Sequence, residues 1–448
     1  MSFLQFFVWG AWLITIANYW FGTKQWEGTQ FGLVFGTMGI ASLFMPTLTG
    51  IIADRWINAE KLYGILHILY AAVLFSFPFV ETPTAFIYVM LLAMCFYMPT
   101  ISLSNSISYT SLKLSNKDVV KDFPPIRVFG TIGFIVAMWI TNLTGNKATE
   151  YQFYIAGIAA LILGFYAFTL PKCEPQKLTK ENATLSETLG LEAFKFFTDY
   201  KMALFFIFSM FLGGALQLTN AYGDVFLDEF KHFPKYADSF VVEYSTIIMS
   251  ISQISETLFI LAIPFFLKRF GIKQVMLISM LAWVLRFALF AFGDPTTGLW
   301  MIIMSCVVYG MAFDFFNISG SLFVETNTEP KNRSSAQGLF MMMTNGFGAV
   351  LGSFTSGWAI DKYFTKSFSN TTELSTYLQT EPDNQLMSGF IQGQGVEITN
   401  GAFSREILMK DWHSIWISFA IYALIIAIAF AILFKHKHKL EDVASVTH

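Results

Sequence analysis

The sequence predicts an all-α membrane protein of twelve transmembrane helices, arranged as two bundles of six. Two observations lead to this prediction: long apolar blocks recur along the 448 residues, and one polar stretch divides them six from six. Charged residues make up 13% of the chain and hydrophobic residues 54%. A soluble domain carries about a quarter charged residues, so the composition indicates a chain that folds in a lipid bilayer.

Each apolar block approaches the roughly 20 residues that a helix needs to cross the hydrocarbon core. Residues 1–171 form the first predicted bundle, with spans at 3–22, 29–52, 60–81, 84–111, 124–145 and 151–171. Residues 200–448 form the second, with spans at 200–226, 239–267, 273–293, 297–325, 334–361 and 412–434. The N-terminal span has no signal-peptide cleavage site, so we interpret it as a membrane helix.

Two segments fall outside the predicted spans. Residues 172–199 are polar, with an amphipathic run at Leu189–Phe197, and we expect them to form a cytoplasmic linker between the bundles. Residues 364–410 form a long external insertion rich in Asn, Thr, Gln, Ser and Gly. Their low apolar content predicts little regular structure.

The charges of the loops orient the predicted helices. Lysine and arginine fall mainly on the side that holds the linker and the C-terminal tail. Such loops face the cytoplasm, which predicts that both termini are cytoplasmic. The net charge of −3 gives no indication of a nucleic-acid partner. Three cysteines, Cys95, Cys173 and Cys306, fit no disulfide framework or metal-binding spacing.

A few predicted spans carry polar residues that lipid should exclude. The charged ones are Arg127, Glu256, Arg286, Asp314 and Glu325, and the amides are Gln217, Asn220, Gln253, Asn317 and Asn345. Charged side chains at mid-membrane depth are costly, and they usually face a cavity or a partner. The sequence therefore predicts a polar site within the membrane.

Helical spacing places several of these residues on common faces. One face of span 124–145 carries Arg127, Thr131 and Phe134. Other pairs lie three or four positions apart: Gln217 with Asn220, Gln253 with Glu256, and Tyr309 with Phe313. If these faces converge, the pocket offers amides, a cation, a carboxylate and aromatic rings. Such a pocket suits a neutral ligand with several hydroxyls and a flat ring.

Each of these residues also has a structural interpretation. Glu256 and Asp314 could pair with Arg127 or Arg286 only to hold helices together, and we interpret Arg286 as structural. The amides could simply bond neighbouring helices. A buried carboxylate can take up and release a proton as its surroundings change. Asp314 and Glu256 are therefore candidates for proton coupling, with Na⁺ coupling as the alternative.

Long segments across nearly the whole chain carry a family resemblance. They are SFLQFFVW at 2–9, DFPPIRVFGTIGF at 122–134, GGALQLTN at 213–220, IMSISQISETLFILAIPFF at 248–266, YGMAFDFFNISG at 309–320 and SSAQGLFMMMTNGFG at 334–348. Together they resemble the nucleoside:H⁺ symporter family of the major facilitator superfamily. The resemblance implies a twelve-helix fold, proton-driven nucleoside uptake across a bacterial inner membrane, no cofactor, and a monomer.

The resemblance also implies residue roles. The substrate-contacting positions of the family fall on Arg127, Thr131, Phe134, Gln217, Asn220, Gln253, Glu256, Tyr309 and Phe313. Asp314 matches an acidic position suited to proton coupling. The pair Asp54 and Arg55 belongs to a reduced form of the superfamily's loop motif, which suggests a cytoplasmic gate or a packing element. The 364–410 insertion is longer than the resemblance leads us to expect.

Three rival functions remain at this point. The first is transport of another small polar solute, such as a sugar or a nucleobase. The second is a non-transporting nutrient sensor that binds a partner through residues 364–410. The third is an intramembrane enzyme, but the sequence has no nucleophile–base pair or metal cluster at catalytic spacing, so we predict that the chain is not an enzyme. The residues do not rank purine against pyrimidine nucleosides.

Overall fold

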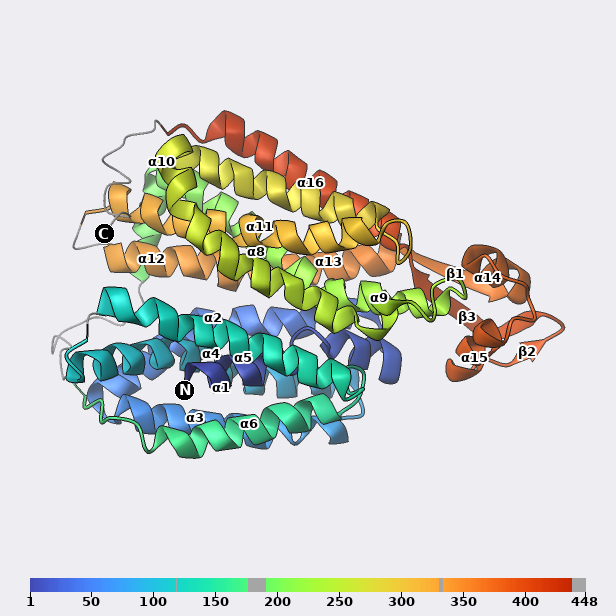
Figure 1. The fold of residues 1–448 in the computed structure, drawn as a ribbon, viewed down its shortest axis with the longest axis horizontal. Helices are drawn as coiled ribbons and strands as arrows, with labels where there is room; N and C mark the ends of the chain where they lie inside the picture. The colour runs from blue at the N-terminus through green and yellow to red at the C-terminus, as the bar shows by residue number, and fades with distance from the viewer. Residues whose placement is uncertain (118, 176–190, 330–332, 437–448) are drawn as a thin grey trace.

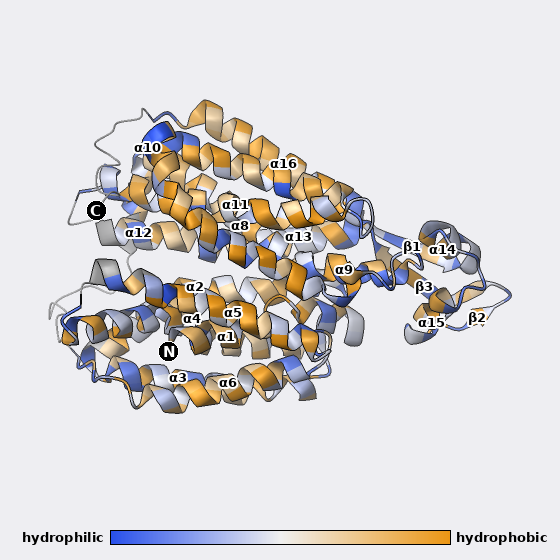
Figure 2. Ribbon diagram, viewed as in Figure 1, coloured by the Kyte–Doolittle hydropathy of each residue, from blue (hydrophilic) through white to orange (hydrophobic). Residues whose placement is uncertain are grey.

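The computed structural model describes residues 1–448 except 118, 176–190, 330–332 and 437–448 (Figure 1). Two bundles of helices lie side by side, and a small unit containing strands projects from one end. Apolar residues cover the middle of the helices, whereas hydrophilic residues gather at their ends and in the projecting unit (Figure 2). This distribution is typical of a protein that spans a bilayer.

The first bundle contains the helices that precede the linker. They are α1 (Ser2–Gly10), η1 (Asn18–Thr23), α2 (Gly28–Arg55), α3 (Ala59–Leu74), η2 (Phe77–Phe79), α4 (Pro83–Leu114), α5 (Val119–Leu143) and α6 (Tyr151–Ala167). Most of the predicted linker, 176–190, lies outside the described residues. Its end forms η3 (Leu191–Thr198), whose phenylalanines pack against the hydrophobic core.

The second bundle contains the helices that follow the linker. They are α8 (Tyr200–Asp228), η4 (Glu229–His232), α9 (Phe240–Glu243), α10 (Ser245–Phe292), α11 (Leu299–Asn327), α12 (Arg333–Met341), η6 (Met342–Gly348), α13 (Ala349–Tyr363) and α16 (Trp412–Leu433). Both η1 and η6 are short π-helices. Such segments are rare and are frequent at functional sites.

Eight helices of the described residues are long and apolar enough to cross a membrane. They cover nine of the predicted spans, because α10 joins the spans 239–267 and 273–293 across a kink at Gly271. Gly271 has a φ of 78°, which glycine adopts without the steric cost that other residues meet.

The other three predicted spans are helical but short or interrupted. The span 3–22 breaks after α1 and resumes as η1, and the span 334–361 contains η6. The helix α6, within the span 151–171, has only 17 residues. The predicted all-α membrane fold is therefore confirmed, while the count of twelve does not correspond to twelve uninterrupted helices.

The prediction that residues 364–410 have little regular structure is wrong. They form β1 (Thr365–Asn370), α14 (Thr371–Leu378), α15 (Gln385–Gly393), β2 (Ile398–Thr399) and β3 (Ala402–Lys410). The three strands make an antiparallel sheet in the order β1-β3-β2. We call this unit the insertion domain.

The insertion domain folds because its few apolar residues recur at helical or strand spacing. Leu374 and Leu378 are four apart on α14, and Ile407 and Met409 are two apart on β3. These residues form a separate core with Phe368, Met387, Ile391 and Val396. Mean composition hides this pattern, which explains the error of the sequence prediction.

The two bundles are joined at the end that carries the insertion domain. Lys147 of the first bundle forms an ion pair with Asp228 of α8, with 2.7 Å between the charged atoms. The Asn142 side chain donates to the Glu243 carbonyl at 2.9 Å. Among the described residues, the hydrogen bonds and ion pairs between the helices of the two bundles lie toward this end. The bundles are therefore closed against each other there.

Candidate functional site

The predicted site residues come from four helices that face the boundary between the bundles. The helix α5 carries Arg127, Thr131 and Phe134; α8 carries Gln217 and Asn220; α10 carries Gln253 and Glu256; α11 carries Tyr309, Phe313 and Asp314. The first helix belongs to the first bundle and the other three to the second. A site between the bundles can therefore change shape when the bundles move relative to each other.

The structure brings the cation and both carboxylates of the predicted site together. Arg127 interacts electrostatically with Glu256 and Asp314, and the two carboxylates interact with each other. Asp314 is buried, whereas Arg127 is exposed between the bundles. None of the three forms a direct ion pair or a side-chain hydrogen bond within the described residues. The purely structural pairing considered from the sequence is therefore not what the structure shows.

Arg286 has a different environment, which agrees with its structural interpretation. Its side chain is fully buried and donates to the carbonyl of Ser305 at 2.7 Å. Two longer bonds of 3.4 Å reach Thr219 and Ser252. Because the guanidinium is bonded to α8, α10 and α11, it ties these helices together.

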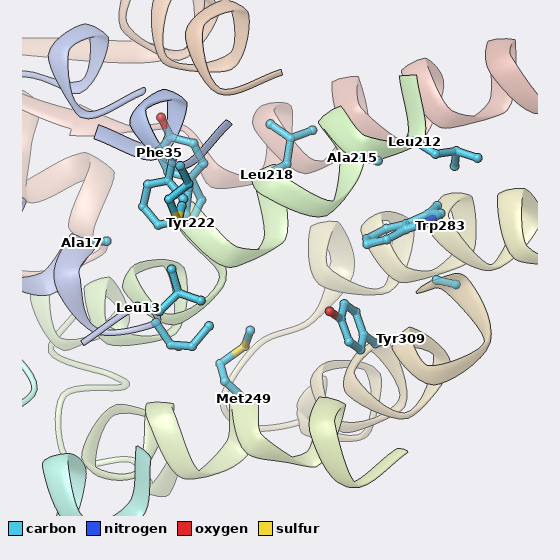
Figure 3. Packing of buried hydrophobic residues seen from close by; sticks show 14 of the residues in the cluster. Leu13, Ala17, Phe35, Leu212, Ala215, Leu218, Tyr222, Met249, Trp283 and Tyr309 are labelled. Atoms are coloured by element: carbon cyan, nitrogen blue, oxygen red, sulfur yellow. The ribbon is translucent and has the colours of Figure 1, made fainter. Parts of the chain in front are cut away.

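Aromatic rings pack against one another on the helices that carry the charged residues or on their neighbours. In the first bundle, Phe134 meets Trp9 edge to face, with ring centroids 6.2 Å apart. In the second, Tyr309 stacks on Phe313 at 6.2 Å and 10°. Trp283 meets Tyr309 at 5.9 Å and 88°, and Figure 3 shows the Trp283 ring between Leu212 and Tyr309. Such faces can hold a flat ring by stacking.

The polar side chains of the site lack partners. The side-chain oxygens of Gln217 and Gln253 are buried without a hydrogen bond among the described residues. Thr131 and Asn220 also form no side-chain hydrogen bond within that part of the chain. An unmade hydrogen bond at a buried group costs about 1–3 kcal/mol. A set of such groups on converging helices indicates a site for a polar ligand.

A cavity extends from the predicted site into the second bundle. It is lined by Leu212, Gly213, Leu216, Trp283, Ala312, Phe313, Phe316, Asn317, Thr344 and Asn345. Of the residues assigned to the site from the sequence, only Phe313 lines this cavity. Asn317 and Asn345 are among the amides of the predicted spans, but they do not belong to the site predicted from the sequence.

The sequence reasoning also missed Trp9, whose indole N–H is buried without a partner among the described residues. Trp9 is the last residue of the segment SFLQFFVW, which is part of the family resemblance and could have pointed to it.

A gating role of Asp54 and Arg55 stays a prediction. Arg55 is exposed at the end of α2, and the Asp54 side chain lies outside what the structure describes.

Comparison with solved structures defines the class of the protein. A crystal structure of the nucleoside transporter NupG matches with a TM-score of 0.82 and 46% identity, covering 97% of this chain and 98% of that one. A bacterial homologue of the lysosomal transporter Spinster shares the fold, with a TM-score of 0.62 and 12% identity over 97% of this chain and 95% of that one. The fold is that of a transporter of the major facilitator type. Within that class, the chain belongs to the nucleoside H⁺ symporter family, whose model matches residues 1–381.

Two curated relatives agree with this assignment. The nucleoside permease NupG of Escherichia coli (strain K12) is 46% identical over 439 residues, which is 98% of this chain and 95% of the relative. The xanthosine permease of the same organism is 47% identical over 451 residues, covering 100% and 98%. The family resemblance is thereby confirmed, and so is the prediction of a transporter and not an enzyme.

Proposed function

We propose that this chain imports nucleosides together with protons through a site between its two bundles. Membership of the nucleoside H⁺ symporter family supports the substrate class and the coupling ion. The single structural observation that carries the proposal is the set of membrane-buried polar side chains without partners. They belong to Trp9 of α1 on one side and to Gln217, Gln253 and Asp314 of α8, α10 and α11 on the other.

The substrate contacts follow from the chemistry of the lining. Phe134 on one side and the Tyr309–Phe313 stack on the other offer faces to the flat base. The free amides of Gln217 and Gln253 can bond the ribose hydroxyls. The names of the two relatives, a nucleoside permease and a xanthosine permease, agree with a ligand of this kind.

The coupling of proton and substrate is assigned to Asp314 and Glu256. Whether each carboxylate keeps a proton depends on its distance from the Arg127 cation. Arg127 belongs to the other bundle, so rocking of the bundles changes that distance. A protonated and substrate-loaded site would then open to the opposite side of the membrane, as alternating access requires.

The orientation in the membrane is part of the proposal. We place a monomer in the bacterial inner membrane, with both termini cytoplasmic and the insertion domain outside. Residues 1–171 and 200–448 are the two moving halves, joined by the 172–199 linker. The closed end is then the external one, and Asp54 and Arg55 lie at the cytoplasmic end of α2, where a gate would act.

Uptake of labelled uridine and adenosine into proteoliposomes tests this function. Wild-type protein should accumulate both when an inward proton gradient is imposed and should stop when an uncoupler is added. Glu256→Gln and Arg127→Ala should each lower uptake to below about one-tenth of wild type, because each removes a charged partner of the site. Glu397→Gln and Arg405→Ala, the same changes on the exposed insertion domain, serve as matched controls.

Two results would contradict the proposal. Normal uptake by both site variants would show that the charged residues between the bundles do not take part. Uptake that ignored the uncoupler but followed a Na⁺ gradient would replace the proton by sodium as the coupling ion. A competition panel of nucleosides, nucleobases and sugars separates the nucleoside assignment from other polar solutes.

A further inference from the structure

A polar contact joins the two bundles at their closed end, one turn of α8 beyond Asn220 of the proposed site. The Asn18 side chain of η1 donates to one carboxylate oxygen of Asp224 on α8. Both residues are buried, with 1% of each exposed. Because the contact crosses from the first bundle to the second, the two groups separate when this end opens.

The contact leaves one oxygen of each group unused. The second carboxylate oxygen of Asp224 and the amide oxygen of Asn18 are buried without a hydrogen bond among the described residues. The hydroxyl of Thr246 on α10 is buried without one as well. Oxygens of a carboxylate and an amide only accept hydrogen bonds. The contact therefore has more acceptors than donors and is short of one proton or one cation.

The lysine that acts on Asp224 is bonded to other groups. Lys147 attracts the Asp224 carboxylate electrostatically, but its amino group pairs with Asp228 at 2.7 Å. The same amino group donates to the Val242 carbonyl at 2.6 Å and to the Ser245 hydroxyl at 3.1 Å. These contacts use its three donor hydrogens. An ionised Asp224 is then a buried charge without a bonded counter-ion, which is costly.

The other groups around Asp224 also favour its neutral form. Asp228, one turn further along α8, is an anion that repels a second negative charge. The elements packed against Asp224 from the two bundles, η1 and α10, present the uncharged side chains of Asn18, Ser245 and Thr246. Asp228 itself is ion-paired with two lysines, so its charge is balanced.

We propose that Asp224 is a second proton-binding site, which must hold a proton for the bundles to close at this end. The proton passes from external water to the free Asp224 oxygen while this end is open, and it is donated to the Asn18 amide oxygen as the end closes. The acid and the amide then exchange two parallel hydrogen bonds, one in each direction, and both free oxygens gain a partner. The inference rests on the proposed orientation and proton-driven transport, and it adds a site distinct from Asp314 and Glu256.

The proton at this site differs from a transported proton. Asp224 is sealed while the opposite end of the bundles is open, so its proton returns to the side from which it came. The site therefore determines how readily the bundles close, and it does not change the number of protons carried with each substrate molecule.

Spin labels on the two bundles at the closed end test the inference in purified protein without substrate, in buffers with choline in place of Na⁺. In wild-type protein, the ratio of open to closed populations should rise at least about tenfold between about pH 6 and about pH 9, because opening releases a proton. Asp224→Asn has the neutral shape of the protonated acid at every pH. It should stay closed, with a ratio that changes by less than about twofold.

Two further variants keep the test informative. Asp238→Asn makes the same change on an exposed carboxylate near the same end and should keep the wild-type response. Asp224→Glu keeps a titrating group and should also respond to pH, which separates loss of titration from damage to the fold. Infrared spectra give a second measurement, because the closed wild-type protein should show a protonated-carboxyl band that Asp224→Asn lacks.

Four results overturn the inference. They are wild-type populations that ignore pH, a pH response that persists in Asp224→Asn, an Asp224→Asn protein that stays open, and closure that follows added Na⁺ at constant pH. The last result would assign the free oxygens to a sodium ion. If wild-type protein carries no nucleoside, the proposed function fails, but the distances do not depend on transport, so the two failures are distinguishable.

Discussion

Buried polar side chains inside the first bundle and those between the bundles are of the same residue types, but they differ in their hydrogen-bond partners. Inside the first bundle, Gln5 is fully buried and every polar group of its side chain is used. Tyr63 donates to its carbonyl oxygen at 2.6 Å, and its amide donates to Thr100 at 2.9 Å. Between the bundles, Gln217 is almost as buried, yet its oxygen has no partner among the described residues.

This difference separates structure from function within the membrane. A bonded amide holds helices together, because its partners lie on neighbouring helices of the same bundle. An unbonded amide at the boundary of the bundles adds nothing to the fold and is available to a ligand. Residue type alone cannot distinguish the two cases, whereas the partners in the structure can.

We expect the largest effect when the same substitution is made at a bonded and at an unbonded buried glutamine. Gln217→Leu should reduce nucleoside uptake more than about tenfold, with a thermal midpoint unchanged or raised, because it removes an unpaired buried oxygen. Gln5→Leu should lower the free energy of unfolding by about 1–2 kcal/mol, because it leaves the Tyr63 hydroxyl without its acceptor. Thermal unfolding in detergent and uptake per folded protein measure the two effects separately. If Gln217→Leu lowered the thermal midpoint and left uptake unchanged, Gln217 would act in stability and not in ligand binding.

A smaller effect is expected at the closed end of the bundles, where one carboxylate forms ion pairs with two lysines. Asp228 pairs with Lys147 of the first bundle at 2.7 Å and with Lys231 of its own bundle at 2.5 Å. Lys147 also donates to the Val242 carbonyl. Lys147→Met therefore breaks a link between the bundles, whereas Lys231→Met removes a bond to the same carboxylate within one bundle.

Lys147→Met should shift the population toward the form open at the insertion-domain end by a few-fold, since a partly buried ion pair contributes about 1 kcal/mol. Distances between spin labels placed on the two bundles at that end report the population. Lys231→Met is the matched control and should leave the distances unchanged. Equal shifts in both variants would mean that the charge of Asp228, and not the link, determines closure.

The sequence could predict what depends on local spacing. Arg127, Thr131 and Phe134 share a face of α5 because a helix repeats every 3.6 residues, and this repeat is visible in one segment. The Lys147–Asp228 pair and the cavity beside Asn345 could not be found in that way. Both depend on how helices that are distant in the sequence pack together. The cavity also depends on the π-helix η6, which a periodic pattern in the sequence does not predict.

The smallest expected effect lies outside the membrane, where water competes for the same groups. Asp411 caps α16 through the backbone N–H of Ser414 and forms a 2.8 Å ion pair with Lys366 of β1. Partial burial would raise the pKa of the Asp411 carboxyl, but the hydrogen bonds from Lys366 and Ser414 outweigh it and hold the pKa below its ordinary value of 3.8. A carboxyl with a lowered pKa stabilises the fold above that ordinary value and loses this contribution as the pH falls through the lowered pKa.

Acid should therefore loosen the junction between β1 and α16 before it affects the membrane helices. Relative to the intrinsic exchange rate at each pH, hydrogen exchange of residues 365–370 should accelerate below a pH of about 3.8 in wild-type protein. Asp411→Asn should show the faster exchange at neutral pH and little further change in acid, because asparagine can cap the helix but cannot form the ion pair. Glu397→Gln, on an exposed side chain without a hydrogen bond among the described residues, should match wild type. An acid response that persisted in Asp411→Asn would place the titrating group elsewhere in the insertion domain.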